Sequence, residues 1–249
     1  MKPLLILLAL LLIRPGFGSL LAALLPEQSM LSLLLQEALL WGLPALLLGG
    51  FRKRVQEKAL IVTAIPAGAA LQCLLAALTV QWMRLVAADP VSVPLPQTVW
   101  SWGLTVFALV IVPAAAEEGF FRGCLQNGTR SVFGSLPACL LSALLFAGAH
   151  GSYSGLPAHL AVGLLCAWTF ETSGCLTACI LLHGAYNAMA LVLTFLVVDS
   201  SWLLLGLSAV IVVEFLLLLP RRRFTSGSPD IRCWLLAGLC IAVSAAAYL

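Results

Sequence analysis

Long apolar segments separated by short polar breaks run along the chain, and this pattern predicts helices that cross a membrane. A stretch of about 20 apolar residues is long enough to span the hydrocarbon core of a bilayer as a helix. The segments that we expect to be helical are residues 4–25, 31–50, 59–87, 98–127, 135–150, 156–170, 175–198, 202–219 and 233–249. Arg14, Pro15 and Gly16 interrupt the first of them, so the pattern predicts eight or nine transmembrane helices.

The composition excludes an ordinary soluble domain and strengthens the membrane prediction. Hydrophobic residues make up 62% of the 249 residues and charged residues only 9%, whereas a soluble domain carries about 25% charged residues. The net charge of +3 does not indicate nucleic-acid binding, because the basic residues lie mostly in short loops. The eight cysteines lie mostly within apolar segments, which favours packing over disulfides. We therefore expect an all-α, polytopic membrane protein.

The distribution of basic residues predicts how the chain is oriented. Loops on the cytoplasmic side of a membrane are enriched in Lys and Arg, and the two main basic clusters are residues 52–58 and 221–223. Counting the predicted spans puts both clusters inside, together with Lys2 and Arg130, and puts the loop at Asp89 outside. We expect a multi-pass protein of a prokaryotic inner (plasma) membrane; a location in the endoplasmic reticulum would give the same pattern.

Three charged residues, Glu117, Glu118 and Arg122, lie in the fourth apolar segment. Ionisable groups within a bilayer are costly and mark functional sites that face the protein interior. Residues four apart share one face of a helix, so Glu118 is predicted to pair with Arg122. Glu117 then lacks a partner in its own helix, and a buried carboxylate without full compensation suits a general base or acid. Taken alone, these three residues fit a structural ion pair as well as they fit a catalytic site.

Two of the three histidines extend this hypothesis. His150 follows Phe146 by four residues, and His183 precedes Asn187 by four, so each pair projects from one helix face. An imidazole and a carboxamide on one face, such as those of His183 and Asn187, can donate hydrogen bonds to an oxyanion. His150 and Glu117 can together bind and deprotonate a water molecule.

The remaining candidate side chains are predicted to be structural. His159 has no polar neighbour at helical spacing in its own segment. Cys124 lies close to the charged residues, and Cys175 and Cys179 share a helical stripe with the next histidine. Small residues on one face are what helices use to pack in a bilayer, so we expect these cysteines to fill the packing interface.

The same residues allow a second chemistry, in which Glu117, His150 and His183 hold a zinc ion whose bound water attacks the substrate. The His-Glu-x-x-His signature of the ordinary zinc proteases is absent from the sequence. The Gly-x-Ser-x-Gly motif of serine hydrolases is absent as well. The sequence therefore leaves open whether a metal is required, and it demands no other cofactor.

At these positions the sequence resembles a known family of membrane proteins. Three motifs occur in the family's order, namely Glu117-Glu118-x-x-x-Arg122, Phe146-x-x-x-His150 and His183-x-x-x-Asn187. They are similar to the motifs of the CAAX-protease and bacteriocin-processing family, also called the Abi family, which consists of glutamate-type intramembrane endopeptidases. The similarity covers about residues 100–195 and includes the stretches 121–126 and 173–183.

The resemblance implies a role for each polar side chain. Glu117, with His150, would activate the attacking water, and His183 and Asn187 would stabilise the tetrahedral oxyanion. The reaction would be hydrolysis of a peptide bond near the C-terminus of a membrane-associated or lipidated protein or peptide. Family members act on prenylated CAAX proteins, on bacteriocins or on C-terminal sorting tails, and the partner implied here is such a hydrophobic peptide in the bilayer.

The resemblance also divides the chain and adds a supporting pair. Glu118 and Arg122 would shape the site. The catalytic core would occupy residues 98–198, from helices four to seven, with further transmembrane helices in residues 1–97 and 199–249. A proton-coupled transporter that uses the same Glu and His residues is an alternative, although the sequence shows no inverted repeat. A non-catalytic membrane immunity or scaffold protein is another.

Overall fold

The computed structural model describes residues 2–26, 29–52, 56–87, 96–195, 202–220 and 225–246. Over these residues the chain is helical and forms no strand, apart from one isolated β-bridge between Gly134 and Ser226. This confirms the predicted all-α class. The loop at Asp89, the basic cluster at 221–223 and the centre of the cluster at 52–58 lie outside the described residues, so the predicted orientation remains a prediction.

The helices follow the predicted apolar segments closely. The α-helices are α1 (Lys2–Leu24), α2 (Ser29–Glu37), α3 (Leu43–Leu47), α4 (Lys58–Leu85), α5 (Val99–Val106), α6 (Val112–Glu118), α7 (Asn127–Phe133), α8 (Ser135–Ala149), α9 (Leu156–Ser173), α10 (Leu176–Phe195), α11 (Trp202–Leu218) and α12 (Ile231–Ala246). Three π-helical segments connect some of them without a break, namely η1 (Ala38–Gly42), η2 (Phe107–Ile111) and η3 (Gly119–Gln126).

Within the described part of the chain, five helical stretches are long and apolar enough to cross a membrane, as judged by length and composition. They are Lys2–Leu24, Ser29–Leu47, Lys58–Leu85, Val99–Phe133 and Leu176–Phe195. Three further apolar helices, Ser135–Ala149, Leu204–Leu218 and Ile231–Ala246, are shorter. The chain is therefore an integral membrane protein, and the expected total of eight or nine spans remains a prediction.

The fourth stretch differs from its predicted form. We expected a helix to about residue 127 and a connection over residues 128–134, but the helix continues to Phe133 and ends only at Gly134, whose φ is 85°. The Thr129 hydroxyl donates to the Leu125 carbonyl one turn earlier, and Arg130 holds the end against α9 through an ion pair of 3.1 Å with Glu171. A partner that is distant in sequence therefore helps to hold the last turn of the helix.

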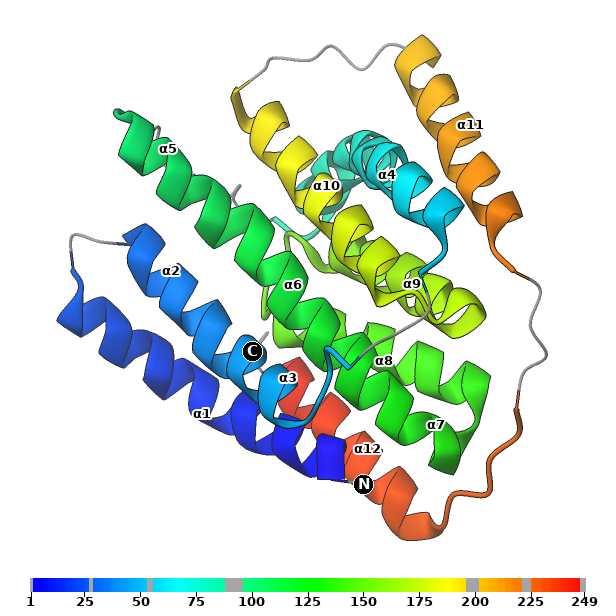
Figure 1. The fold of residues 1–249 in the computed structure, drawn as a ribbon. Helices are drawn as coiled ribbons and strands as arrows, with labels where there is room; N and C mark the ends of the chain where they lie inside the picture. The colour runs from blue at the N-terminus through cyan, green and yellow to red at the C-terminus, as the bar shows by residue number, and fades with distance from the viewer. Residues whose placement is uncertain are drawn as a thin grey trace.

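The length of this stretch decides the depth of the charged residues. It contains 35 residues, or about 52 Å at 1.5 Å per residue, so Glu117 lies near its middle. In Figure 1 it forms one continuous rod from α5 to α7, with α1 and α2 on one side and α10 on the other. The expected helix over residues 98–127 would have put Glu117 closer to one end.

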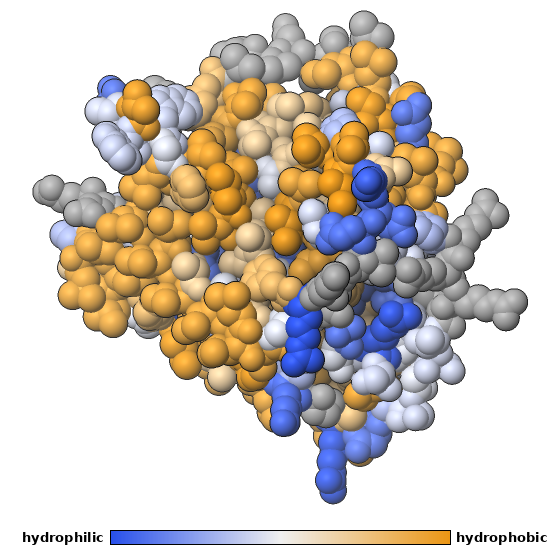
Figure 2. Space-filling view, viewed as in Figure 1, coloured by the Kyte–Doolittle hydropathy of each residue, from blue (hydrophilic) through white to orange (hydrophobic). Residues whose placement is uncertain are grey.

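The other helices pack around this rod in pairs. α10 lies along α4, α8 pairs with α9, and α1 runs beside α12 (Figure 1). The segment before α12 is tied to the start of α8, because the Ser135 N–H donates to the Thr225 carbonyl over 3.0 Å. Figure 2 shows apolar side chains over most of the visible face, with hydrophilic side chains gathered towards the lower right. A broad apolar surface of this kind suits contact with lipid.

Gly68 lets α4 and α10 approach closely. A Cβ atom at this position would collide with the backbone carbonyl oxygen of Leu182, one residue before His183. We predict that Gly68→Ala lowers the free energy of unfolding by about 1–3 kcal/mol, as overpacking of a tight interface does. Gly238→Ala is the matched control, because a Cβ at Gly238 in α12 would contact nothing within 4 Å. Thermal unfolding in detergent measures both, and equal midpoints for the two variants would contradict the close packing.

Candidate active site

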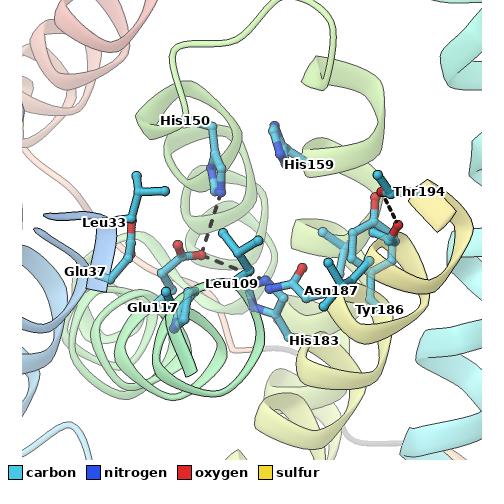
Figure 3. Close-up of a pocket in the computed structure, with 15 residues that line it drawn as sticks. Leu33, Glu37, Leu109, Glu117, His150, His159, His183, Tyr186, Asn187 and Thr194 are labelled. Atoms are coloured by element: carbon cyan, nitrogen blue, oxygen red, sulfur yellow. Dashed lines mark hydrogen bonds and ion pairs between the residues drawn. The ribbon is translucent and has the colours of Figure 1, made fainter. Parts of the chain in front are cut away.

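A polar cavity lies in the apolar interior of the protein. Its volume is about 320 Å³, and its walls come from α2, η2, α6, α9 and α10 and from the residue that follows α8. Figure 3 shows the polar side chains pointing into it from several helices. Those that line it are Glu37, Glu117, His150, His159, His183, Tyr186, Asn187 and Thr194. The three predicted motifs therefore meet in one place, although they come from separate segments of the chain.

Glu118 and Arg122 form the predicted pair one turn apart. Arg122 Nη1 lies 3.0 Å from Glu118 Oε1, and both side chains are fully buried. Arg122 Nη2 also donates to the Gly163 carbonyl over 2.8 Å, and the guanidinium carbon lies 4.6 Å from the centre of the Phe146 ring. A guanidinium held by a carboxylate, a carbonyl and an aromatic face is fixed in orientation, so this pair forms a rigid support beside the cavity.

The Glu118 carboxylate also contacts His183. His183 Nδ1 lies 2.9 Å from Glu118 Oε1. Glu118 is already paired with Arg122, so it accepts, and we assign the donated proton to Nδ1 of His183. This hydrogen bond fixes the ring and directs Nε2 towards Glu117, whose Oε2 lies 3.9 Å away.

Glu117 and His150 face each other in the wall of the cavity. His150 Nε2 lies 3.8 Å from Glu117 Oε2 (Figure 3). His150 Nδ1 lies 2.8 Å from the Phe146 carbonyl, which can only accept, so this nitrogen carries the proton and Nε2 presents a lone pair. Glu117 Oε2 is buried and has no hydrogen-bond partner among the described residues. A basic oxygen and a basic nitrogen therefore point at the same small volume.

Asn187 lies one turn after His183 on α10 and lines the same cavity. In Figure 3 the two side chains project from α10 on the side that faces Glu117. A carboxamide in this position can supply an N–H donor next to the imidazole of His183. The sequence predicted this shared face from the spacing alone.

The geometry does not fit the zinc alternative. Two ligands of one tetrahedral zinc ion, each about 2.0–2.1 Å from the metal, lie about 3.3 Å apart. Glu117 Oε2 lies 3.8 Å from His150 Nε2 and 3.9 Å from His183 Nε2, which is wider. Among the described residues, no group of three His, Cys, Asp or Glu side chains is arranged to hold a metal ion. The described residues therefore do not form a zinc site.

Four polar residues of the cavity wall were not predicted to belong to the site, namely Glu37, His159, Tyr186 and Thr194. His159, which we expected to be structural, stacks on His150 with ring centres 3.9 Å apart and an interplanar angle of 24°. Glu37 comes from α2, far from the motifs in sequence. Glu37 is the one acidic residue of the apolar segment 31–50, and a lone ionisable residue inside a span is a signal that could have identified it. For His159, no polar residue at helical spacing indicates that it belongs to the site.

The cysteines near the motifs are buried, as their predicted packing role requires. Cys175 and Cys179 are fully buried, and Cys124 is 6% exposed. Cys179 Sγ lies 3.4 Å from the Cys166 carbonyl of the neighbouring helix α9, so this side chain contacts the α9–α10 interface. All eight cysteines are free thiols.

The fold and the cavity define the class of protein: an all-helical integral membrane protein that gathers a carboxylate, imidazoles and a carboxamide in its apolar interior. Residues 98–189 match the family described as "Type II CAAX prenyl endopeptidase Rce1-like". This match confirms the resemblance to the CAAX-protease family that the sequence shows in this segment. No curated protein and no solved structure matches the chain. The family is one of CAAX-type intramembrane proteases, and all three motifs lie inside the matched segment.

Proposed function

We propose that the protein is a glutamate-type intramembrane endopeptidase that hydrolyses a peptide bond near the C-terminus of a membrane-anchored or lipidated protein. The observation that carries the proposal is the convergence on Glu117 Oε2 of two imidazole nitrogens, at 3.8 Å and 3.9 Å, inside the family-matched segment. We assign the catalytic core to residues 98–198, as the sequence predicts.

The first step is activation of water by Glu117 and His150. A water molecule between Glu117 Oε2 and His150 Nε2 donates a hydrogen bond to each of these atoms. As its oxygen forms a bond to the scissile carbonyl carbon, one proton passes to the Glu117 carboxylate. When the C–N bond breaks, Glu117 returns this proton to the leaving amine, and the carboxylate is restored.

The second requirement is a place for the negative charge on the carbonyl oxygen. Asn187 donates an N–H, and His183 donates from Nε2 when it is protonated. Glu118 holds the imidazole ring in place, because its carboxylate accepts the hydrogen bond from Nδ1. Donors fixed in advance in an interior of low dielectric constant stabilise an oxyanion strongly. Glu118 and Arg122 act here as supporting residues.

The walls of the cavity support a hydrophobic substrate. Apolar side chains from three helices, Leu33, Leu109 and Leu191, line it together with the polar groups. The family acts on prenylated or membrane-anchored substrates in a membrane. Apolar walls beside polar groups suit a peptide that carries a lipid or a hydrophobic tail, since such a substrate loses little on leaving the bilayer.

The experiment that tests the function compares host membranes. One strain carries the wild-type chain and another carries Glu117→Ala at matched expression, and the C-termini of membrane and lipidated proteins are mapped by mass spectrometry. We expect one or a few proteins to lose a defined cleavage in the variant. If no terminus changes while solute uptake or toxin resistance does, the proposal fails in favour of a carrier or an immunity protein.

The assignment of Asn187 makes a separate prediction. Asn187→Leu preserves approximate size but removes the donor, so we expect kcat to fall by about 10²–10³-fold, as for the loss of one oxyanion donor. Thr63 in α4 offers the control, because its hydroxyl likewise donates to a carbonyl of its own helix, that of Ala59, and it does not line the cavity. Cleavage by Thr63→Val should stay within about threefold of the wild type. An Asn187→Leu variant of normal kcat would remove this residue from the mechanism.

A further inference from the structure

Two imidazole rings stack in the wall of the cavity. His159 of α9 lies on the face of His150, with the ring centres 3.9 Å apart and an angle of 24° between the rings. Both residues line the cavity, and Figure 3 shows them side by side. His159 belongs to none of the three motifs, so its place beside His150 comes from the packing of α9 against α8. The stack adds a ring contact to a residue that we assign to water activation.

His150 needs support from outside its own helix. It is the residue that follows α8, where a turn rather than a further helical residue continues the chain. Its Nδ1 lies 2.8 Å from the Phe146 carbonyl, and the Phe146 ring lies 4.8 Å away at an angle of 56°. A hydrogen bond at one atom leaves the tilt of a ring free, whereas a second ring on its face fixes the plane. The stack with His159 therefore helps to set the direction of His150 Nε2, which lies 3.8 Å from Glu117 Oε2.

A glycine makes room for the second ring. Gly155 lies one turn before His159, and its carbonyl accepts the His159 N–H over 2.8 Å. A Cβ atom at Gly155 would lie 2.5 Å from Cε1 and 2.9 Å from Nδ1 of the His159 ring. The φ of Gly155 is −94°, which any residue adopts, so this glycine serves space and not backbone conformation. The His159 ring is thus confined by the His150 ring and by the backbone at Gly155.

Packing, rather than a hydrogen bond at Nδ1, holds the His159 ring. Its Nδ1 atom is buried and has no hydrogen-bond partner among the described residues. A buried ring nitrogen is normally hydrogen-bonded, so the place of this ring is set by the contact of its face with His150. A flat ring without nitrogen atoms should therefore make the same contact.

We propose that His159 is a positioning residue, whose ring fixes the plane of His150 and keeps His150 Nε2 directed at the water beside Glu117. This inference rests on the proposed peptidase function. His159 transfers no proton in this role and touches no reacting atom. The role requires a flat ring at position 159 and the space that Gly155 leaves for it.

Three proteins test the need for a ring, namely the wild type, His159→Phe and His159→Ala, purified into lipid nanodiscs. The probe is a farnesylated peptide that ends in a Cys-aliphatic-aliphatic-Met sequence, and its released C-terminal fragment is quantified. His159→Phe keeps a flat ring, so its kcat should stay within about threefold of the wild type. His159→Ala leaves the His150 ring without its stacking partner, so kcat should fall about 10- to 100-fold while KM changes little.

Gly155 tests the same contact without changing the cavity. Gly155 lies outside the described walls of the cavity, and the methyl group of Gly155→Ala should push the His159 ring out of the stack and lower kcat about 10-fold. Gly103→Ala in α5 is the control, because a Cβ there would contact nothing within 4 Å. In the His159→Ala background, Gly155→Ala should lower kcat no further, since no ring remains to be displaced.

The outcomes separate this role from a general structural one. A His159→Ala variant with the wild-type kcat overturns the proposal. So does a His159→Phe variant as slow as His159→Ala, since the ring would then act through its nitrogen atoms. A Gly155→Ala effect that persists in the His159→Ala background has the same consequence. Thermal unfolding of each variant identifies any loss of fold, and His159→Phe and Gly155→Ala keep the test decisive if His159→Ala does not fold.

Nuclear magnetic resonance tests the stack without using activity. The chain has three histidines, so histidine-selective labelling gives a simple spectrum of ring Cε1–H signals, and His150→Gln identifies the signal of His150. His159→Ala should shift this signal, because the stacked ring no longer acts on it, whereas Gly103→Ala should leave it in place. If the His150 signal does not move, the proposal is wrong even when the wild type cleaves peptides. If the wild type cleaves nothing in the peptide assay or in host membranes, the peptidase function fails, and the shift still decides whether the stack exists.

Discussion

Glu117→Gln should abolish proteolysis while leaving the protein folded. Glutamine has nearly the same shape as glutamate, so the cavity and its apolar walls keep their form and KM should change little. The amide cannot accept the proton of the attacking water, and we expect kcat to fall by about 10²–10⁴-fold, the usual contribution of a general base. The substrate is a farnesylated peptide that ends in a Cys-aliphatic-aliphatic-Met sequence. The measurement is the rate at which protein in lipid nanodiscs releases its C-terminal fragment.

A matched control and an isotope experiment make this prediction specific. Glu57 is exposed at the start of α4, so Glu57→Gln removes the same charge away from the cavity and should cleave at the wild-type rate. In water enriched with heavy oxygen, the wild type should place one solvent oxygen in the new C-terminal carboxylate. Undiminished cleavage by Glu117→Gln would remove Glu117 from the mechanism.

Arg122→Met should cause the largest loss of stability of any single substitution in the site. Arg122 is fully buried, and its removal leaves the Glu118 carboxylate inside the protein without its guanidinium. Breaking a buried ion pair in this way costs about 3–5 kcal/mol. The hydrogen bond to the Gly163 carbonyl of α9 is lost as well. We therefore expect a much lower midpoint in thermal unfolding, followed in detergent by size-exclusion chromatography.

The double variant Arg122→Met with Glu118→Leu distinguishes a charge effect from a packing effect. Replacing both partners leaves no uncompensated charge, so the double variant should be more stable than Arg122→Met alone. Arg232→Ala, at an exposed position near the start of α12, is the control and should change the midpoint little. A double variant less stable than Arg122→Met would show that packing, rather than the unpaired carboxylate, dominates.

The local face relations in the site could be predicted because they depend only on helical geometry. A spacing of four places Glu118 next to Arg122 and puts His183 and Asn187 on one face, and the structure has both arrangements. The depth of Glu117 was harder to predict. Residues 128–134 contain two glycines and an asparagine precedes them, which favours a loop, but Arg130 pairs with Glu171 of α9 and the helix continues to Phe133.

The contacts between distant segments could not be predicted from spacing. His159 stacks on His150 because α9 packs against α8, and nothing within its own helix indicates this. Glu37 lines the same cavity as Glu117 because α2 lies against the long central helix. Both contacts depend on how whole helices cross each other, and crossing is decided by the shapes of many side chains at once.

By itself the sequence determined the class of this protein and indicated its chemistry. Apolar segments longer than a soluble protein would carry require a membrane, and rare polar residues within them, in the order of a known family, indicate a peptidase site. Only the tertiary structure decided which polar groups come together: the two imidazoles at Glu117 Oε2, and Glu37 in the wall of the same cavity. The physical reason is that helical periodicity fixes neighbours along one helix, whereas contacts between helices come from packing over the whole chain.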